Sequence, residues 1–281
     1  MSNEIEEVPL EDIEWINGFA TPPAPPVRPF HALAAVFKLV RNKEDTRQVF
    51  EAVSALSGAN GKRLFKRFTS TPYGRRVVSE PVRLEKILTD REKLRALPEG
   101  SVGHAYLDFM EGENLTADGL IDAAEEAGID FRGETQFEDY RRLFLHLDVS
   151  HDLWHVLTGY GRDALGELCN LAYTRTQTNN PGFRLIIFIG LIAQKIEQPF
   201  APLMKAVAEG ARIGRNAKWI LEQDVEELLR LPLEEVRKRL NMPRPEIYNS
   251  VPDEIKQNLL KPKVAKTQTE REGLNEPQPA A

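Results

Sequence analysis

Two histidines and three acidic residues lie within the stretch HDLWHVLTGYGRDALGELC (151–169), in a chain that has five histidines in all. His151 and His155 are four residues apart. On a helix they therefore lie one turn above each other on the same face, where two imidazoles can reach one metal ion. Asp152 lies about 100° further round the same helix, close enough to bind or to hydrogen-bond a ligand. The pattern predicts a metal-binding site.

Glu167 can join this site only if the helix breaks, because continuous helix would place it ~18 Å from His155. Gly159 and Gly161 disfavour a helix interior and permit the positive φ of a C-terminal cap, while Asp163 can begin the next helix. Two helices that fold back through this turn would bring Glu167 towards the histidines. Two neutral nitrogens and one or two carboxylates would leave coordination positions open, as in a catalytic rather than a structural metal site.

Three other interpretations of these residues are weaker. A zincin carries H-E-x-x-H, but Asp152 stands here where that family has its general base, which disfavours peptide hydrolysis. An HD phosphohydrolase needs further histidines upstream, and neither His104 nor His146 has a persuasive spacing. A lone histidine on a half-buried helix is most often only packed or hydrogen-bonded. The pair of histidines beside an aspartate and a glycine break favours the metal site.

The composition is that of an ordinary globular chain. Of 281 residues, 28% are charged and 41% hydrophobic, and the formal net charge is −6. No dense cluster of Lys and Arg is found, so we expect no nucleic-acid partner. Cys169 is the only cysteine, which excludes an intrachain disulfide and favours a reducing cytoplasm. The acidic N-terminus lacks the features of an export signal. The apolar run 185–193, interrupted by Gly190, is about half the ~20 residues that a spanning helix needs.

Apolar residues recur mostly at helical spacing, without sustained two-residue alternation or internal repeats. We therefore predict an all-α fold, a single helical domain over 30–260 with about eight to ten helices. The first two helices, 30–40 and 45–56, are each predicted to bury one apolar stripe. The first stripe holds Phe30, Leu33, Val36, Phe37 and Val40, the second holds Val49, Phe50, Val53 and Leu56, and further helices are predicted at 83–95, 101–111, 117–127, 137–157, 163–177, 183–195, 199–212 and 221–240.

Both ends of the chain are predicted to lie outside this domain. Residues 1–29 include GFATPPAPPVRP (18–29), whose five prolines indicate a flexible, extended arm. Residues 261–281 have almost no large apolar side chains to offset their ordering entropy, which predicts a disordered tail.

The segment FRLIIFIGLIAQ (183–194) is apolar nearly all round. It predicts either a central core helix, which is the more common structure for such a segment, or the wall of a tunnel for an isoprenoid tail. In the tunnel interpretation Ile187 and Ile189 line the passage. Arg184, which flanks the apolar run, would then meet an anionic head group.

Three stretches resemble one known family. His151, Asp152, His155 and, after eleven intervening residues, Glu167 resemble the metal motif of the Coq-four family of ubiquinone (coenzyme Q) biosynthesis proteins. The stretches LPEGSVGHAYLDFM and WILEQDVEELLRLPLEEVRKRLNM are similar to segments that this family carries before and after the motif. The resemblance covers about residues 75–242. The loop 112–136 departs from the eukaryotic members, which indicates a bacterial relative.

The resemblance implies a helical protein that binds one divalent metal ion through His151, Asp152, His155 and Glu167. The implied activity is a metal-dependent decarboxylase or lyase reaction: oxidative decarboxylation and hydroxylation at ring carbon one of a polyprenylated hydroxybenzoate. Asp152 and Glu167 are then the catalytic candidates. The family implies zinc, but zinc has no redox chemistry, and this ligand set also suits iron or manganese.

Two alternatives to an enzyme stay open: a lipid-binding scaffold that organises quinone-biosynthesis enzymes around a structural metal, and a helical regulator without metal. The implied partners are the prenylated quinone precursor and other quinone-biosynthesis proteins, and a homodimer is left open. We expect a cytoplasmic protein that is peripheral on the cytoplasmic face of a bacterial inner membrane. Because anionic lipid would repel its net charge, membrane contact is expected through an exposed apolar helix face.

Overall fold

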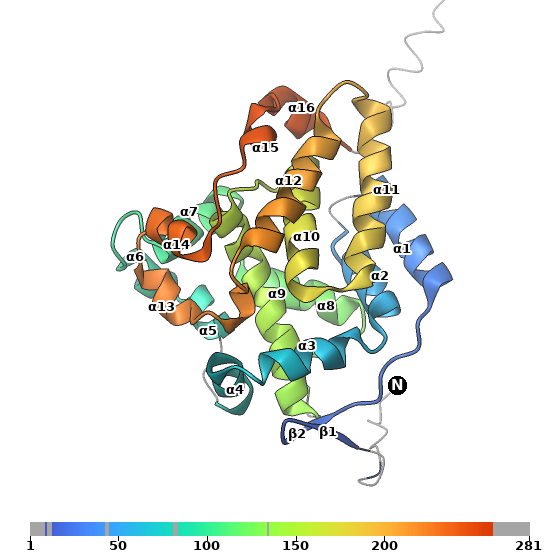
Figure 1. Cartoon of the computed structure of the whole chain (residues 1–281), viewed down its shortest axis with the longest axis vertical. Helices are drawn as coiled ribbons and strands as arrows, with labels where there is room; N and C mark the ends of the chain where they lie inside the picture. The colour runs from blue at the N-terminus through green and yellow to red at the C-terminus, as the bar shows by residue number, and fades with distance from the viewer. Residues whose placement is uncertain (1–8, 10–12, 43–44, 81–83, 134, 261–281) are drawn as a thin grey trace, which may run out of the picture.

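The computed structural model describes residues 9, 13–42, 45–80, 84–133 and 135–260. Within them the chain forms sixteen α-helices and one short hairpin (Figure 1). This confirms the predicted all-α fold. The elements before the centre are β1 (Glu14–Ile16), β2 (Phe19–Thr21), α1 (Pro29–Arg41), α2 (Arg47–Ser57), α3 (Asn60–Phe68), α4 (Pro72–Ser79), α5 (Leu84–Thr89), α6 (Arg91–Arg95), α7 (Val102–Gly112) and α8 (Ala117–Glu126). They are followed by α9 (Glu138–Thr158), α10 (Ala164–Thr178), α11 (Pro181–Glu197), α12 (Leu203–Asn216), the 3-10 helix η2 (Ile220–Glu222), α13 (Val225–Arg230), α14 (Leu233–Leu240), α15 (Glu246–Ser250) and α16 (Asp253–Asn258).

The described helices outnumber the eight to ten predicted, because several predicted helices are divided and some short ones were missed. The predicted helix 83–95 is two helices, α5 and α6, and the side chain of Asp90 between them caps α6 by accepting from the N–H of Lys93. The predicted helix 221–240 is likewise divided into η2, α13 and α14. Apolar residues recur at nearly the same helical spacing across each division, so this spacing alone did not reveal that the helix is divided.

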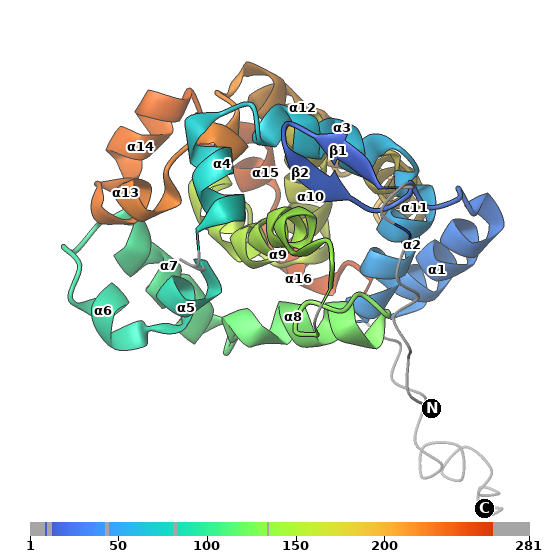
Figure 2. The same ribbon diagram turned by 90° about the horizontal axis from the view of Figure 1, so that it is seen from below.

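Helices α9 and α10 form the centre of the molecule. Around α9 lie α3, α4, α5, α7 and α8, as the view along its axis shows (Figure 2). Around α10 lie α11, α12 and α16. The two central helices are buried on nearly every side from Val149 to Tyr173, and they contain all the predicted metal ligands. The site is therefore built on the most enclosed part of the fold.

Glycines allow α12 to lie directly on α10. A Cβ atom at Gly210 would be 2.4 Å from the backbone oxygen of Cys169, and one at Gly214 would be 2.9 Å from that of Tyr173. Both approaches are too short for any other residue without separation of the helices. This packing fixes α10 from the side opposite to α9.

The apolar faces of α1 and α11 differ from the prediction. Helix α1 packs on α2 through Ala32, Ala35 and Val36, because small side chains allow the helices to approach closely, and its larger apolar side chains face outward. Helix α11 lies at the edge of the molecule beside α1 (Figure 1), so it is not the central core helix. The exposed large apolar side chains on α1, on α11, in the segment after α11 and in the first turn of α12 are Phe30 (86%), Leu33 (38%), Phe37 (53%), Phe188 (63%), Ile192 (47%), Ile196 (77%), Phe200 (99%) and Met204 (61%).

Part of the predicted N-terminal arm forms the β1–β2 hairpin. Asn17 and Gly18, with φ of 54° and 91°, make its turn. The Asn17 side chain donates to the carbonyl of Lys66 and to the hydroxyl of Thr69, both at 2.8 Å, which holds the hairpin on α3. The predicted tail, 261–281, lies outside the described residues. Among the described helices, none has the length and apolar content needed to cross a bilayer.

We predict that Gly210→Val lowers the free energy of unfolding by about 3 kcal/mol, because its side chain must displace the backbone of α10. Urea denaturation followed by circular dichroism measures this change. Gly112→Ala is the control, since a Cβ atom at this helical position meets nothing within 4 Å. Equal effects of the two substitutions would contradict the packing described for α10 and α12.

Candidate metal centre

The predicted break between the two motif helices is present. Helix α9 ends at Gly159, which has φ of 81° and donates its N–H to the carbonyl of His155 at 2.8 Å. Helix α10 begins after Asp163, whose carboxylate accepts from the N–H groups of Leu165 and Gly166 at 3.1 Å. Gly159 thus has the positive φ predicted for this turn. The break reverses the chain and points the first turn of α10 at α9.

Gly161 serves the turn through its small size rather than through positive φ. Its N–H donates to the hydroxyl of Tyr248 at 3.0 Å, and a Cβ atom there would be 2.8 Å from that hydroxyl. The Tyr248 hydroxyl in turn donates to Asp163. Gly166 is equally constrained, because a Cβ atom would lie 2.0 Å from the carbonyl oxygen of Gly161. These contacts leave room for little except glycine at both positions.

The C-terminal helices hold this turn in place. Buried Arg237 on α14 donates to the carbonyls of Val156 and Leu157 at 2.9 Å, which pairs carbonyl groups at the end of α9 with a cation. Tyr248 on α15 binds the other side of the turn. Sequence reasoning missed both residues. They are about 80 or more positions away from their partners, and no local pattern signals such a contact.

Three of the predicted ligands come together across the break. The Nε2 atoms of His151 and His155 are 3.2 Å apart, and Oε2 of Glu167 lies 3.6 Å and 3.4 Å from them, respectively. Ligands at 2.0–2.1 Å from a tetrahedral ion are about 3.3 Å from one another. The donor set and its spacing therefore fit a divalent metal ion bound by two imidazoles and one carboxylate.

The surroundings of His155 orient its imidazole for coordination of a metal ion. Its Nδ1 lies 3.0 Å from the carbonyl oxygen of Tyr160 and can only donate to it, which leaves the Nε2 lone pair for a metal ion. Phe109 of α7 stacks on the imidazole, with ring centroids 5.7 Å apart and 16° between the planes. The His155 side chain has no exposed surface, whereas Glu167 is 32% exposed. The metal-ligand group is therefore enclosed at His155 and accessible to solvent at Glu167.

Burial and mutual attraction act on the ionisable groups of the site. Burial alone would lower the pKa of His151, but its hydrogen bond to Glu167 and the nearby carboxylates raise it above its ordinary value. Burial alone would raise the pKa of Glu167, yet the two histidines hold it well below its usual range. The carboxylate thus stays charged and available as a ligand. Arg162 lies near the same carboxylate, with its Nε 3.8 Å from Oε1 of Glu167.

Asp152, the fourth predicted ligand, does not belong to the group that the structure brings together. It is 5% exposed, and its negative charge favours the protonated forms of His151 and of the Tyr106 hydroxyl. Sequence reasoning missed Asp148, one turn earlier on the same helix face. Its Oδ2 is buried without a hydrogen-bond partner, and burial raises the pKa of Asp148 to about 7. The spacing of three residues before His151 could have identified it.

Other residues singled out from the sequence lie elsewhere. Ile187 and Ile189 are partly buried against the core, and Arg184 is exposed. Neither of the two described cavities is lined by α11, so the tunnel stays a prediction. His104 lies 3.4 Å from Asp108 on α7, outside the metal-ligand group. His146 packs against Phe68 and Tyr73, and burial lowers the pKa of His146 to about 4.

Comparison with known proteins identifies the family of the chain. The family model for "Coenzyme Q (ubiquinone) biosynthesis protein Coq4" matches residues 26–246. The bovine mitochondrial COQ4 homologue is 28% identical over 205 residues, which are 69% of this chain and 72% of that protein. The human homologue is 25% identical over 205 residues, 70% and 73% of the two chains. The resemblance seen in the motifs thus extends over most of the chain.

A crystal structure has the same fold. A protein from Nostoc punctiforme PCC 73102, whose name assigns it to ubiquinone biosynthesis, matches with a TM-score of 0.55 and 22% identity over 77% of this chain and 99% of that one. The fold and site thus define an all-helical protein with a two-histidine, one-carboxylate group at a helix break. The chain belongs to the Coq4 family and is a ubiquinone biosynthesis protein.

We predict that His155→Ala abolishes stoichiometric metal binding, from about one ion per chain to less than about 0.1, because two ligands from separate helices cannot close the site alone. Elemental analysis of protein purified without a histidine tag measures this. Helical content should persist, since apolar packing stabilises the helices. His104→Ala, outside the ligand group, is the control and should keep its metal. Full metal occupancy in His155→Ala would refute the ligand assignment.

Proposed function

We propose that this protein is a metal-dependent enzyme of ubiquinone biosynthesis that acts on a polyprenylated hydroxybenzoate. The carboxyl group on ring carbon one leaves as carbon dioxide, and a hydroxyl group takes its place. This is a two-electron oxidation of the ring, so an acceptor such as dioxygen must take up the electrons. The observation that carries the proposal is the group formed by His151, His155 and Glu167, with spacing that fits one divalent ion.

The side chains of the site have distinct tasks in this proposal. The two histidines and Glu167 hold the ion, which supplies Lewis acidity and positions for a further ligand. Zinc fits the observed spacing, and iron or manganese fit an oxidative reaction better. Asp152, buried close to the ligands, is a candidate to accept the proton of a ring hydroxyl. Arg162 is a candidate to orient Glu167.

A non-catalytic lipid-binding scaffold is the second candidate, favoured by the exposed apolar side chains on α1 and α11. In that case the metal would be structural and the ring would be bound unchanged. Purified protein should therefore decide between the two roles, because a scaffold has no turnover in the absence of partner proteins.

We predict that purified protein loaded with zinc, iron(II) or manganese(II) converts a prenylated hydroxybenzoate to the decarboxylated, hydroxylated product, detected by mass spectrometry. Glu167→Gln should lower turnover at least about 100-fold, because it weakens the only charged ligand of the group. His104→Gln should retain turnover. If substrate binds but no metal yields product under aerobic conditions, the enzyme proposal fails and the scaffold remains.

We also propose peripheral attachment to the cytoplasmic face of a bacterial inner membrane through the apolar face, defined as the eight exposed large apolar side chains of α1, α11, the segment that follows α11 and the first turn of α12. A prenylated ring partitions into the bilayer, so an enzyme whose described helices do not span the membrane must meet it at the surface. Phe200 is almost fully exposed, as suits insertion between lipids. Exposed Lys38 and Arg41 on α1 offset the repulsion between the acidic chain and anionic lipid.

We predict that the double substitution Phe188→Ser and Phe200→Ser reduces partitioning into phosphatidylcholine–phosphatidylglycerol vesicles about tenfold or more, since each burial contributes about 1.5–3 kcal/mol. Co-flotation measures partitioning. Trp15→Ser, which removes a side chain 62% exposed on the hairpin, is the control. If the double substitution instead dissociates a dimer in sedimentation and leaves vesicle binding intact, the apolar face joins two copies of the chain.

A further inference from the structure

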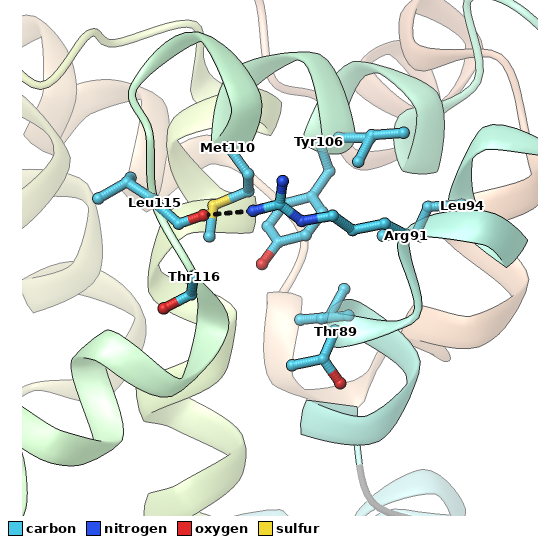
Figure 3. Close-up of a pocket in the computed structure, with 9 residues that line it drawn as sticks. Thr89, Arg91, Leu94, Tyr106, Met110, Leu115 and Thr116 are labelled. Atoms are coloured by element: carbon cyan, nitrogen blue, oxygen red, sulfur yellow. Dashed lines mark hydrogen bonds between the residues drawn. The ribbon is translucent and has the colours of Figure 1, made fainter.

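A cavity of about 140 Å³ lies beside α7, between that helix, α5, α6 and the segment that leads into α8 (Figure 3). Much of its wall is apolar, with Leu94, Leu107 and Met110 among the side chains. A dry apolar cavity of about 150 Å³ in another protein holds one benzene molecule. This cavity therefore has room for a single six-membered ring, with its open side available to substituents.

One polar group inside the cavity lacks a partner. Tyr106 is 1% exposed, and its hydroxyl is buried without a hydrogen bond. Figure 3 shows this hydroxyl directed into the space between Thr116 and Thr89 rather than into the helix packing. A buried hydroxyl without a partner costs about 1–3 kcal/mol. A ligand that carries a hydrogen-bonding substituent would remove this cost.

A cation lies at the same cavity. The guanidinium of Arg91 passes in front of the Tyr106 ring (Figure 3) and donates to the carbonyl of Leu115 at 2.8 Å. It also lies 3.7 Å from Glu111, which pairs more closely with Arg95 at 2.6 Å. These contacts use only part of the five N–H donors of a guanidinium. Arg91 can therefore receive a carboxylate while it keeps its present contacts.

Helix α7 joins this cavity to the metal centre. Tyr106 lines the cavity, and its hydroxyl interacts electrostatically with Asp152. Phe109, one turn further along α7, stacks on the metal-ligand candidate His155. A ring in the cavity would thus lie on the other side of one helix layer from the metal ligands. The two sites are therefore connected through neighbouring residues of one helix.

We propose that this cavity is a second binding site, separate from the metal centre, for a single aromatic ring of the hydroxybenzoate class, with its carboxylate at Arg91 and its ring hydroxyl at Tyr106. The assignment rests on the cavity, the unpaired hydroxyl and the guanidinium, and not on the proposed function. The cavity selects for a single ring that has an anionic group and a hydrogen-bonding group at its two ends.

Binding of 4-hydroxybenzoate to the full-length protein, measured by ligand-observed NMR titration, tests this assignment. Arg91→Gln should weaken binding about tenfold and leave binding of phenol, which has no carboxylate, nearly unchanged. Arg95→Gln is the matched control, because Arg95 also pairs with Glu111 but does not line the cavity. Tyr106→Phe should remove the preference for 4-hydroxybenzoate over benzoate, and Met110→Trp should fill the cavity and abolish binding.

The outcomes separate this proposal from the proposed function. Equal effects of Arg91→Gln and Arg95→Gln, or binding that survives a folded Met110→Trp variant, would overturn the cavity assignment. The predicted binding pattern without turnover by any metal-loaded protein supports the ring site and refutes the enzyme.

Discussion

The break between α9 and α10 is the constraint on which the candidate metal centre depends. Two imidazoles on one helix are a local feature, but their carboxylate partner comes from the next helix and must be turned back towards them. Gly159 provides the left-handed residue at which α9 ends, and Asp163 caps the first N–H groups of α10. The reversal converts a sequence separation that would span ~18 Å in a helix into an observed contact of 3.4 Å between His155 and Glu167.

Such a tight reversal exposes backbone groups that need partners in a buried setting, and the fold supplies them from its C-terminal helices. Arg237 pairs with carbonyls at the end of α9, and Tyr248 bridges Gly161 and Asp163. Glu209, 3% exposed, in turn accepts from the N–H groups at the start of α15, including that of Tyr248. The ligand geometry thus relies on residues far along the chain that bind no metal, because an unpaired buried carbonyl or N–H group would loosen the turn.

The sequence predicted the helical fold and the helix break because both follow from local chemistry: apolar spacing, glycine φ and side-chain capping. The sequence was a poor guide to which apolar helix faces point away from the core. Val36 of the predicted stripe on α1 is buried, but Phe30, Leu33 and Phe37 are exposed. The other buried residues of this helix are the alanines Ala32 and Ala35. Amphipathic spacing shows that a helix has an apolar side, not that a protein partner covers it. The hairpin at Asn17–Gly18 had a recognisable turn signal, but strands of three residues are too short to show alternation.

The same distinction between local and distant contacts explains the candidate site. His151, His155 and Glu167 could be identified because ligand spacing is a property of helices. The position of Asp152 could not, because adjacent residues on a helix diverge by about 100° and only tertiary packing decides which of them faces the site. Asp148 and Asp152 are both more than nine-tenths buried on the same helix as the histidines. Buried carboxylates so close together repel each other and are costly unless a cation is near. A divalent ion at the three-residue group would supply that charge and would favour the ionised form of both carboxylates.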